Sequence, residues 1–88
     1  MNLGEITNAM STLKNWSLNG QEIEKDFEFN TFQESIDFVN KVAELAEKHQ
    51  HHPDIVISYN FVKLTLTTHS EKTLTEKDFT LAAEIDKL

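Results

Sequence analysis

The chain has 88 residues, of which 39% are hydrophobic and 26% charged, and this composition is typical of one folded domain. Fifteen acidic residues outnumber eight basic ones, all lysine, and the net charge of −7 argues against binding to nucleic-acid phosphates. Cysteine is absent, which excludes disulfides and thiolate sites. The chain has no apolar run of ~20 residues and no signal-peptide pattern at Met1–Glu5, so we expect a cytoplasmic protein without a membrane span.

The first third of the chain predicts a helix followed by a β-hairpin. Apolar residues fall on one side of a helix that starts near Leu3 and ends near Asn15. Asn19-Gly20 is typical of a two-residue hairpin turn, which would place Trp16 opposite Ile23. Residues 22–29 then alternate, with glutamates and an aspartate on every second position. This pattern indicates a strand with one buried face and one acidic, solvent-facing side.

The middle of the chain predicts its longest helix. Thr31 and Glu34 have the spacing of a capping box, in which each side chain accepts a hydrogen bond from the other residue's backbone N–H. Pro53 cannot continue a helix, so we expect the helix to end between His49 and His51. Its apolar positions form an unusually wide arc: Phe32, Ile36, Phe38, Val39, Val42, Ala43, Leu45 and Ala46. Such an arc favours packing on the sheet and on a second surface.

Two further strands follow, at residues 55–59 and 61–67, with a tight turn at Asn60-Phe61. This turn would make the numbers of directly paired residues sum to 121, so that His52 lies opposite His69. A polar loop, residues 69–73, then connects the second strand to the last predicted helix.

The last predicted helix opens with a capping box of Thr75 and Asp78 and a hydrophobic staple of Leu74 on Phe79. The element order is therefore α-β-β-α-β-β-α over a single domain, residues 1–88. We predict an α+β fold in which a four-stranded antiparallel sheet has its helices packed on one face.

These elements bring titratable groups to one edge of the expected fold. His51 and His52 leave the long helix, His69 ends a strand and Asp78 opens the last helix. Each has a simpler interpretation: histidines at a helix end can cap carbonyls, our interpretation for His49, and Asp78 can serve the capping box alone. Glu47 is spaced to orient His51 if the helix lasts.

A metal site is a further alternative for these histidines. His51, His52 and His69 could offer three nitrogens, although adjacent histidines diverge along an extended backbone. The chain has no pair of histidines at the i, i+4 spacing of a helical metal site.

The spacing of seven specified positions resembles the signature of the pterin-4a-carbinolamine dehydratases. Glu47, three residues, His51-His52-Pro53, five residues, Tyr59, nine residues, His69, eight residues and Asp78 follow one another in this order. The resemblance extends upstream to Trp16, the Asn19-Gly20 turn and Phe27-x-Phe29-x-x-Phe32, and so covers nearly all of the chain.

This resemblance implies the four-stranded α+β fold read above and dehydration of 4a-hydroxytetrahydropterin to quinonoid dihydropterin, which recycles the cofactor of aromatic amino acid hydroxylases. No metal or organic cofactor is expected. The implied catalytic residues are His51, His52, His69, Glu47 and Asp78. The implied substrate contacts are Gln50, His51, His52, Thr67, Thr68, His69 and Ser70.

Histidine suits this chemistry, because neutral and protonated imidazole coexist near pH 7 and can remove one proton and deliver another. We expect His51 and His69 to form the acid/base pair and His52 chiefly to bind substrate, with Glu47 and Asp78 orienting or polarising them.

The main alternative is a protein-interaction module. Some members of the family that this chain resembles are dimerisation partners of a homeodomain transcription factor and act as transcriptional coactivators, a role separate from catalysis. The expected partners are thus a pterin, a further copy of the chain in a homodimer or homotetramer and, in the alternative function, another protein.

Overall fold

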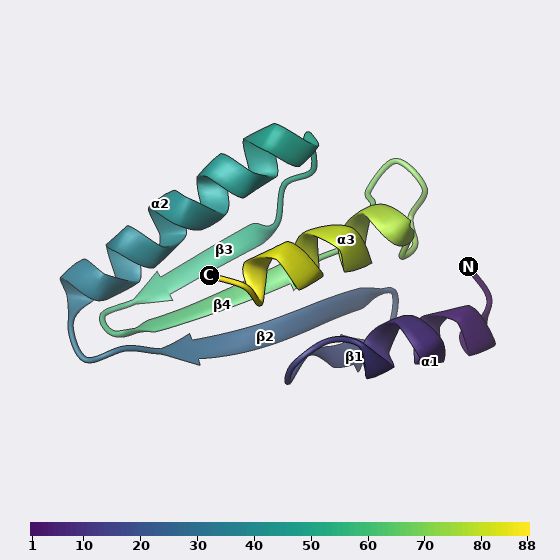
Figure 1. Cartoon of the computed structure of the whole chain (residues 1–88), viewed down its shortest axis with the longest axis horizontal. Coiled ribbons are helices and arrows are strands. Elements are labelled where there is room, and N and C mark those ends of the chain that lie inside the picture. Colours follow the sequence, from purple (N-terminus) through teal and green to yellow (C-terminus); the bar gives the residue numbers. More distant parts are fainter.

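The computed structural model describes all 88 residues, and its element order is the predicted one (Figure 1). Two pairs of strands separate the three helices, as expected from the periodicity of apolar residues. Their bounds are α1 Leu3–Ser11, β1 Ser17–Asn19, β2 Glu22–Glu28, α2 Phe32–His49, β3 Asp54–Ser58, β4 Phe61–Leu66 and α3 Glu76–Ile85. None of the helices combines the length and apolar character needed to cross a bilayer.

The four strands form one antiparallel sheet in the order β1-β2-β4-β3 (Figure 1). β4 lies between β2 and β3, and its alternate residues Val62, Leu64 and Leu66 are fully buried. Because successive side chains of a strand point to opposite faces, the residues between them point to the other side of the sheet. In this order β1 and β3 are the edge strands, and β2 and β4 are the inner strands.

The core lies on one face of this sheet. α2 contributes Val42, and α3 contributes Phe79, Leu81 and Ile85, to the cluster that covers the apolar side chains of β2 and β4. Apolar side chains of α1 are half-buried against the same cluster. The opposite face carries the carboxylates of β2, such as Asp26, and no helix, so the fold class is confirmed.

The ends of the helices follow local sequence signals. Both predicted capping boxes are present, Thr31 with Glu34 on α2 and Thr75 with Asp78 on α3. α2 ends at His49, where Gln50 turns into the left-handed region with φ 51°. This is within the predicted limits. α1 ends at Ser11, earlier than the expected end near Asn15, so that prediction was wrong.

Both hairpin turns differ from the prediction by one residue. The first turn is Gly20-Gln21, so Leu18, not Trp16, pairs with Ile23. The second is Tyr59-Asn60, with Ser58 paired to Phe61, so each partner in β4 lies two positions earlier than expected. The predicted pairing of His52 with His69 is therefore wrong, and both residues lie outside the strands.

Candidate active site

A cavity of about 250 Å³ lies where the end of α2, the end of β4 and the start of α3 meet. The residues that line it come from segments that are distant in the sequence but adjacent in the fold. The eight lining residues are Gln50, His51, His52, Thr67, Thr68, His69, Ser70 and Lys77. Seven of these are the substrate contacts that the family resemblance implied. Their common location is thus an observation of the structure, while their roles are a proposal.

His51 is held by Asp78 at the inner side of this cavity. Its Nε2 lies 2.5 Å from Asp78 Oδ1, and the two side chains are 10% and 0% exposed. A carboxylate accepts, so the imidazole Nε2–H is the donor, and Nδ1 is the nitrogen left for other chemistry. The prediction that Glu47 orients His51 is wrong, because α2 ends before His51 and the i, i+4 alignment is lost.

Glu47 pairs instead with His52. The distance between Glu47 Oε2 and His52 Nε2 is 2.5 Å, and both side chains face solvent, with exposed fractions of 72% and 60%. An exposed pair of this kind contributes at most about 1 kcal/mol to stability. Its effect is to restrict the His52 ring, whose remaining nitrogen is free.

His69 follows β4 and is exposed at the mouth of the cavity. No carboxylate forms an ion pair with its ring, in contrast to the other two histidines. His69 is therefore the least constrained of the three imidazoles.

Three of the polar side chains around the cavity are already engaged within the protein. The Thr67 hydroxyl donates to the Gln21 carbonyl at 2.7 Å, and the Gln50 amide donates to the Glu47 carbonyl at 2.6 Å. The Thr68 hydroxyl donates to Asp78 Oδ2 at 2.8 Å and belongs to a side chain that is almost fully buried. Thr67 and Thr68 can therefore meet a ligand only as hydrogen-bond acceptors, whereas the histidine rings, Ser70 and Lys77 remain as donors.

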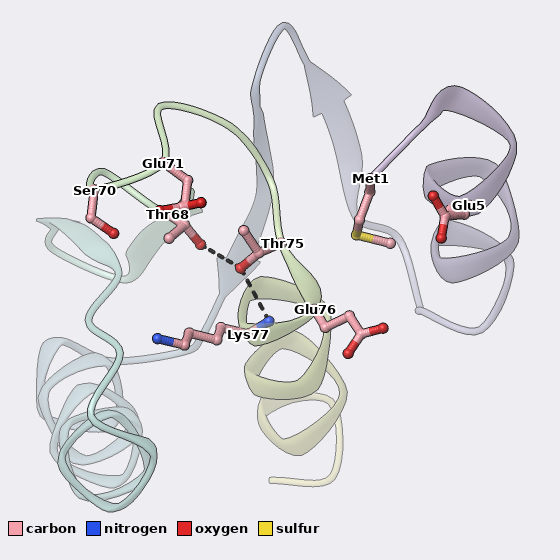
Figure 2. Close-up of a pocket in the computed structure, with 8 residues that line it drawn as sticks. All are labelled: Met1, Glu5, Thr68, Ser70, Glu71, Thr75, Glu76 and Lys77. Carbon is pink, nitrogen blue, oxygen red and sulfur yellow. Dashed lines mark hydrogen bonds between the residues drawn. The ribbon is translucent and has the colours of Figure 1, made fainter.

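Lys77 is the lining residue that sequence reasoning missed. It lies in the first turn of α3, one position before Asp78, and its position next to a predicted site residue was the available signal. It also lines a second, adjoining cavity of about 500 Å³, together with Thr68, Ser70 and three glutamates, one of which is Glu76 (Figure 2). Lys77 also lines a third cavity with His49 and His51, so it is a cation shared by three neighbouring cavities.

The histidine-metal alternative does not fit the geometry of the site. His51 and His52 are directed to different carboxylates, and no three histidine, aspartate or glutamate side chains gather in a way that could hold a metal ion. The interpretation of His49 as a cap of helix carbonyls is not met by its Nε2, because this atom is buried and donates to no carbonyl.

Comparison with known proteins agrees with the fold. Residues 1–88 match the model of the family described as pterin 4 alpha carbinolamine dehydratase. A relative from Cyanothece sp. that is assigned to the pterin-4-alpha-carbinolamine dehydratases is 52% identical over 84 residues, covering 96% of this chain and 87% of the relative. The chain therefore belongs to the pterin-4a-carbinolamine dehydratase family.

Two solved structures have the same fold. A transcriptional coactivator/pterin dehydratase from Brucella melitensis superposes with a TM-score of 0.93 at 34% identity, over 99% of this chain and 95% of that one. A pterin dehydratase-like RuBisCO assembly factor of the α-carboxysome gives a TM-score of 0.72 at 24% identity, over 86% and 90% of the two chains. The second likeness extends to the fold alone.

Proposed function

We propose that the chain dehydrates 4a-hydroxytetrahydropterin to quinonoid dihydropterin and water, and so recycles the cofactor of aromatic amino acid hydroxylases. The observation that supports this most is the single cavity that collects Gln50, Thr67, Thr68, Ser70 and the three histidines. The family match over the whole chain and the names of its relatives point to the same reaction.

The reaction breaks the C4a–O bond, and it moves two protons. One proton reaches the departing hydroxyl, which leaves as water, and another leaves a ring nitrogen as the C=N bond forms. In the proposed mechanism, His51 removes the nitrogen proton through Nδ1, because Asp78 occupies Nε2. His69, which has no carboxylate partner, protonates the leaving oxygen. His52 chiefly binds the pterin, and Glu47 orients its ring.

A coupled assay tests this proposal. The purified chain is added to an aromatic amino acid hydroxylase that is limited by slow spontaneous dehydration of the 4a-hydroxypterin. We expect the chain to raise the rate of quinonoid dihydropterin formation in proportion to its concentration. A rate equal to that of heat-inactivated chain would refute the proposed activity.

The proposed proton transfers use only side chains, so the rate is expected to be independent of metal ions. Prolonged dialysis of an untagged preparation against a chelator should leave kcat unchanged. A loss of activity that added zinc restores would instead support a metal mechanism and remove the acid/base assignment.

A protein-interaction role is the second candidate. It is supported by the Brucella relative, whose name includes transcriptional coactivator, and by the exposed apolar surface that α2 retains at Phe32. The −7 charge disfavours direct contact with DNA, so such a role would act through a protein partner. A chain with intact histidines that binds a partner but has no activity in the coupled assay would favour this function.

A further inference from the structure

The carboxylate of Asp78 is fully buried and surrounded by donors alone. Oδ1 faces His51 Nε2, while Oδ2 accepts from the Thr68 hydroxyl at 2.8 Å and from the Thr75 backbone N–H at 2.9 Å. A buried polar group without partners is costly, and this one has a donor on each oxygen. Asp78 therefore has one well-defined orientation, which its second oxygen determines as much as its first.

The direction of the next hydrogen bond follows from counting protons. The hydroxyl oxygens of Thr68 and Thr75 are 2.7 Å apart (Figure 2). A threonine hydroxyl has one proton, and Thr68 gives its proton to Asp78, so Thr75 must be the donor to Thr68. The lone pairs of Thr75 accept from the Lys77 backbone N–H at 3.3 Å, as expected of an N-cap. The bonds thus run one way, from Thr75 to Thr68 to Asp78.

We infer that Thr75 and Thr68 are positioning residues, which fix Asp78 and through it the tautomer and orientation of the His51 ring. The consequence for the reaction rests on the proposed function, whereas the consequence for the ring does not. The resemblance implied that Thr68 contacts substrate. Its hydroxyl proton is instead used inside the protein, and its side chain is 5% exposed.

Kinetics separates a positioning role from a substrate contact. Thr68→Val and Thr75→Val keep the side-chain shape but remove the hydroxyl. Each should lower kcat on the order of 10-fold, a part of the ~10²- to 10⁴-fold that a positioned acid or base contributes, with little change in KM. Thr68→Ser and Thr75→Ser, which retain the hydroxyl, should keep most of the rate. A raised KM at unchanged kcat in Thr68→Val would overturn the inference in favour of a substrate contact.

The chain offers a matched control for loss of the helix cap. Thr31 has the same capping-box role on α2, and none of its hydrogen bonds leads to Asp78. Thr31→Val should lower the thermal midpoint through loss of a helix cap, as Thr75→Val also does, but should leave kcat unchanged. Equal losses of kcat in both variants would show that the effect of Thr75 is one of stability.

The ring of His51 provides a readout that needs no turnover. Nitrogen-15 shifts should show the Nε2–H tautomer of His51 in the unaltered chain, and a mixture of tautomers in folded Thr68→Val and Thr75→Val. This result would hold even if the coupled assay found no dehydratase activity. His51 signals that are identical in the unaltered chain and in both valine variants would refute the inference, whatever the kinetics.

Discussion

His51 and His52 are consecutive residues in opposite surroundings. His51 is bonded to a carboxylate that no solvent reaches, whereas His52 and Glu47 are both largely exposed. The sequence predicted the set of residues at this edge from their spacing. It could not predict which carboxylate pairs with which histidine, because that depends on Gln50, whose positive φ directs His51 inward and away from the α2 axis.

Replacing the two proposed proton-transfer residues should affect the chemical step. We expect His51→Ala and His69→Ala each to lower kcat by about 10²- to 10⁴-fold, which is the usual contribution of a general acid or base. His52→Ala should chiefly raise KM, as expected when binding is lost equally from the ground and transition states. Steady-state kinetics with each 4a-hydroxy stereoisomer measures these effects, since the two roles can depend on the face that carries the hydroxyl.

The thermal midpoints of the same variants should also differ. His51→Ala leaves Oδ1 of the buried Asp78 without its donor, which costs about 1–3 kcal/mol, while His69→Ala removes an exposed ring and should leave stability unchanged. His49→Ala serves as the kinetic control. A loss of kcat there equal to that of His51→Ala would contradict the proposed site.

Asp86 joins the C-terminal end of α3 to two other parts of the chain. Its carboxylate accepts from the Trp16 indole at 2.9 Å, from the Lys25 ammonium at 2.9 Å and from the Lys14 backbone N–H at 3.0 Å. Burial by itself raises the pKa of Asp86, but the hydrogen bonds from Lys25, Lys14 and Trp16 and the charge of Lys25 outweigh it, so the pKa lies below its usual value.

This depressed pKa makes a prediction about acid stability. Because the folded-state pKa is lower than the unfolded one, the contribution of Asp86 is complete above about pH 4 and is lost as the pH falls through the folded-state pKa. Asp86→Asn should therefore cost about 1.5–3 kcal/mol near pH 7, and the difference from the unaltered chain should shrink in acid. Urea unfolding at several pH values measures it.

The control for Asp86 is Glu84→Gln, which removes an exposed pair with Lys87 at the same helix end. That change should cost no more than about 1 kcal/mol. Equal losses for the two variants near pH 7 would show that the buried contacts of Asp86 contribute nothing beyond an exposed charge.

Among the elements, the alternation of apolar residues predicted the strands β2 and β4 with their buried faces, but neither hairpin register was predicted correctly. Moving a turn by one residue shifts each partner by two positions, and a two-position shift returns every side chain to the same face. The apolar pattern is therefore the same for both registers and cannot distinguish them. In the β3–β4 hairpin, Tyr59 occupies the first turn position with a φ of 53°, and the Asn60 side chain donates to the Phe29 carbonyl at 3.0 Å. The hydrogen bond joins residues that are distant in the sequence, so the local pattern of residues could not predict this register.

The two glycines of the chain should respond in opposite ways to replacement by alanine. Gly20 has a φ of 61° in the β1–β2 turn, where a Cβ is strained even though nothing lies within 4 Å of it. Gly20→Ala should cost about 1 kcal/mol. Gly4 lies in α1, where Ala is preferred, and Gly4→Ala should be neutral or stabilising by up to about 1 kcal/mol. A higher thermal midpoint for Gly20→Ala than for Gly4→Ala would contradict this account of the turn.

In the molecule as a whole, apolar side chains are left exposed at the start of α2 and on the edge strand β3. Phe32 at the start of α2 is 50% exposed, and Ile55 and Val56 on the edge strand β3 are 37% and 56% exposed. The β3 edge also has free backbone donors and acceptors, since β4 is its only neighbour in the sheet. The wide apolar arc of α2 thus has a second surface that this chain alone does not cover.

We expect the chain to form a homo-oligomer, a dimer at least, through α2 and the edge of the sheet. Light scattering at micromolar concentration should give a mass of two or more chains, and Phe32→Gln should shift the equilibrium toward the monomer. Leu3→Gln, at a leucine of α1 that is 72% exposed, is the matched control and should leave the mass unchanged. A single-chain mass for the unaltered protein would contradict the expectation.

The unequal edges of the sheet also limit how far such an assembly can extend. β1 has three residues, so it offers few backbone groups, whereas β3 has five, and the outer face between them carries the carboxylates of β2. Like charges on two such faces repel, which disfavours stacking of sheet on sheet. A two-fold contact through β3 would use the longer edge of both copies at once, and a closed contact of this kind cannot propagate. In such a dimer the β3 edge of both copies would be paired and so unavailable for the growth of a fibre.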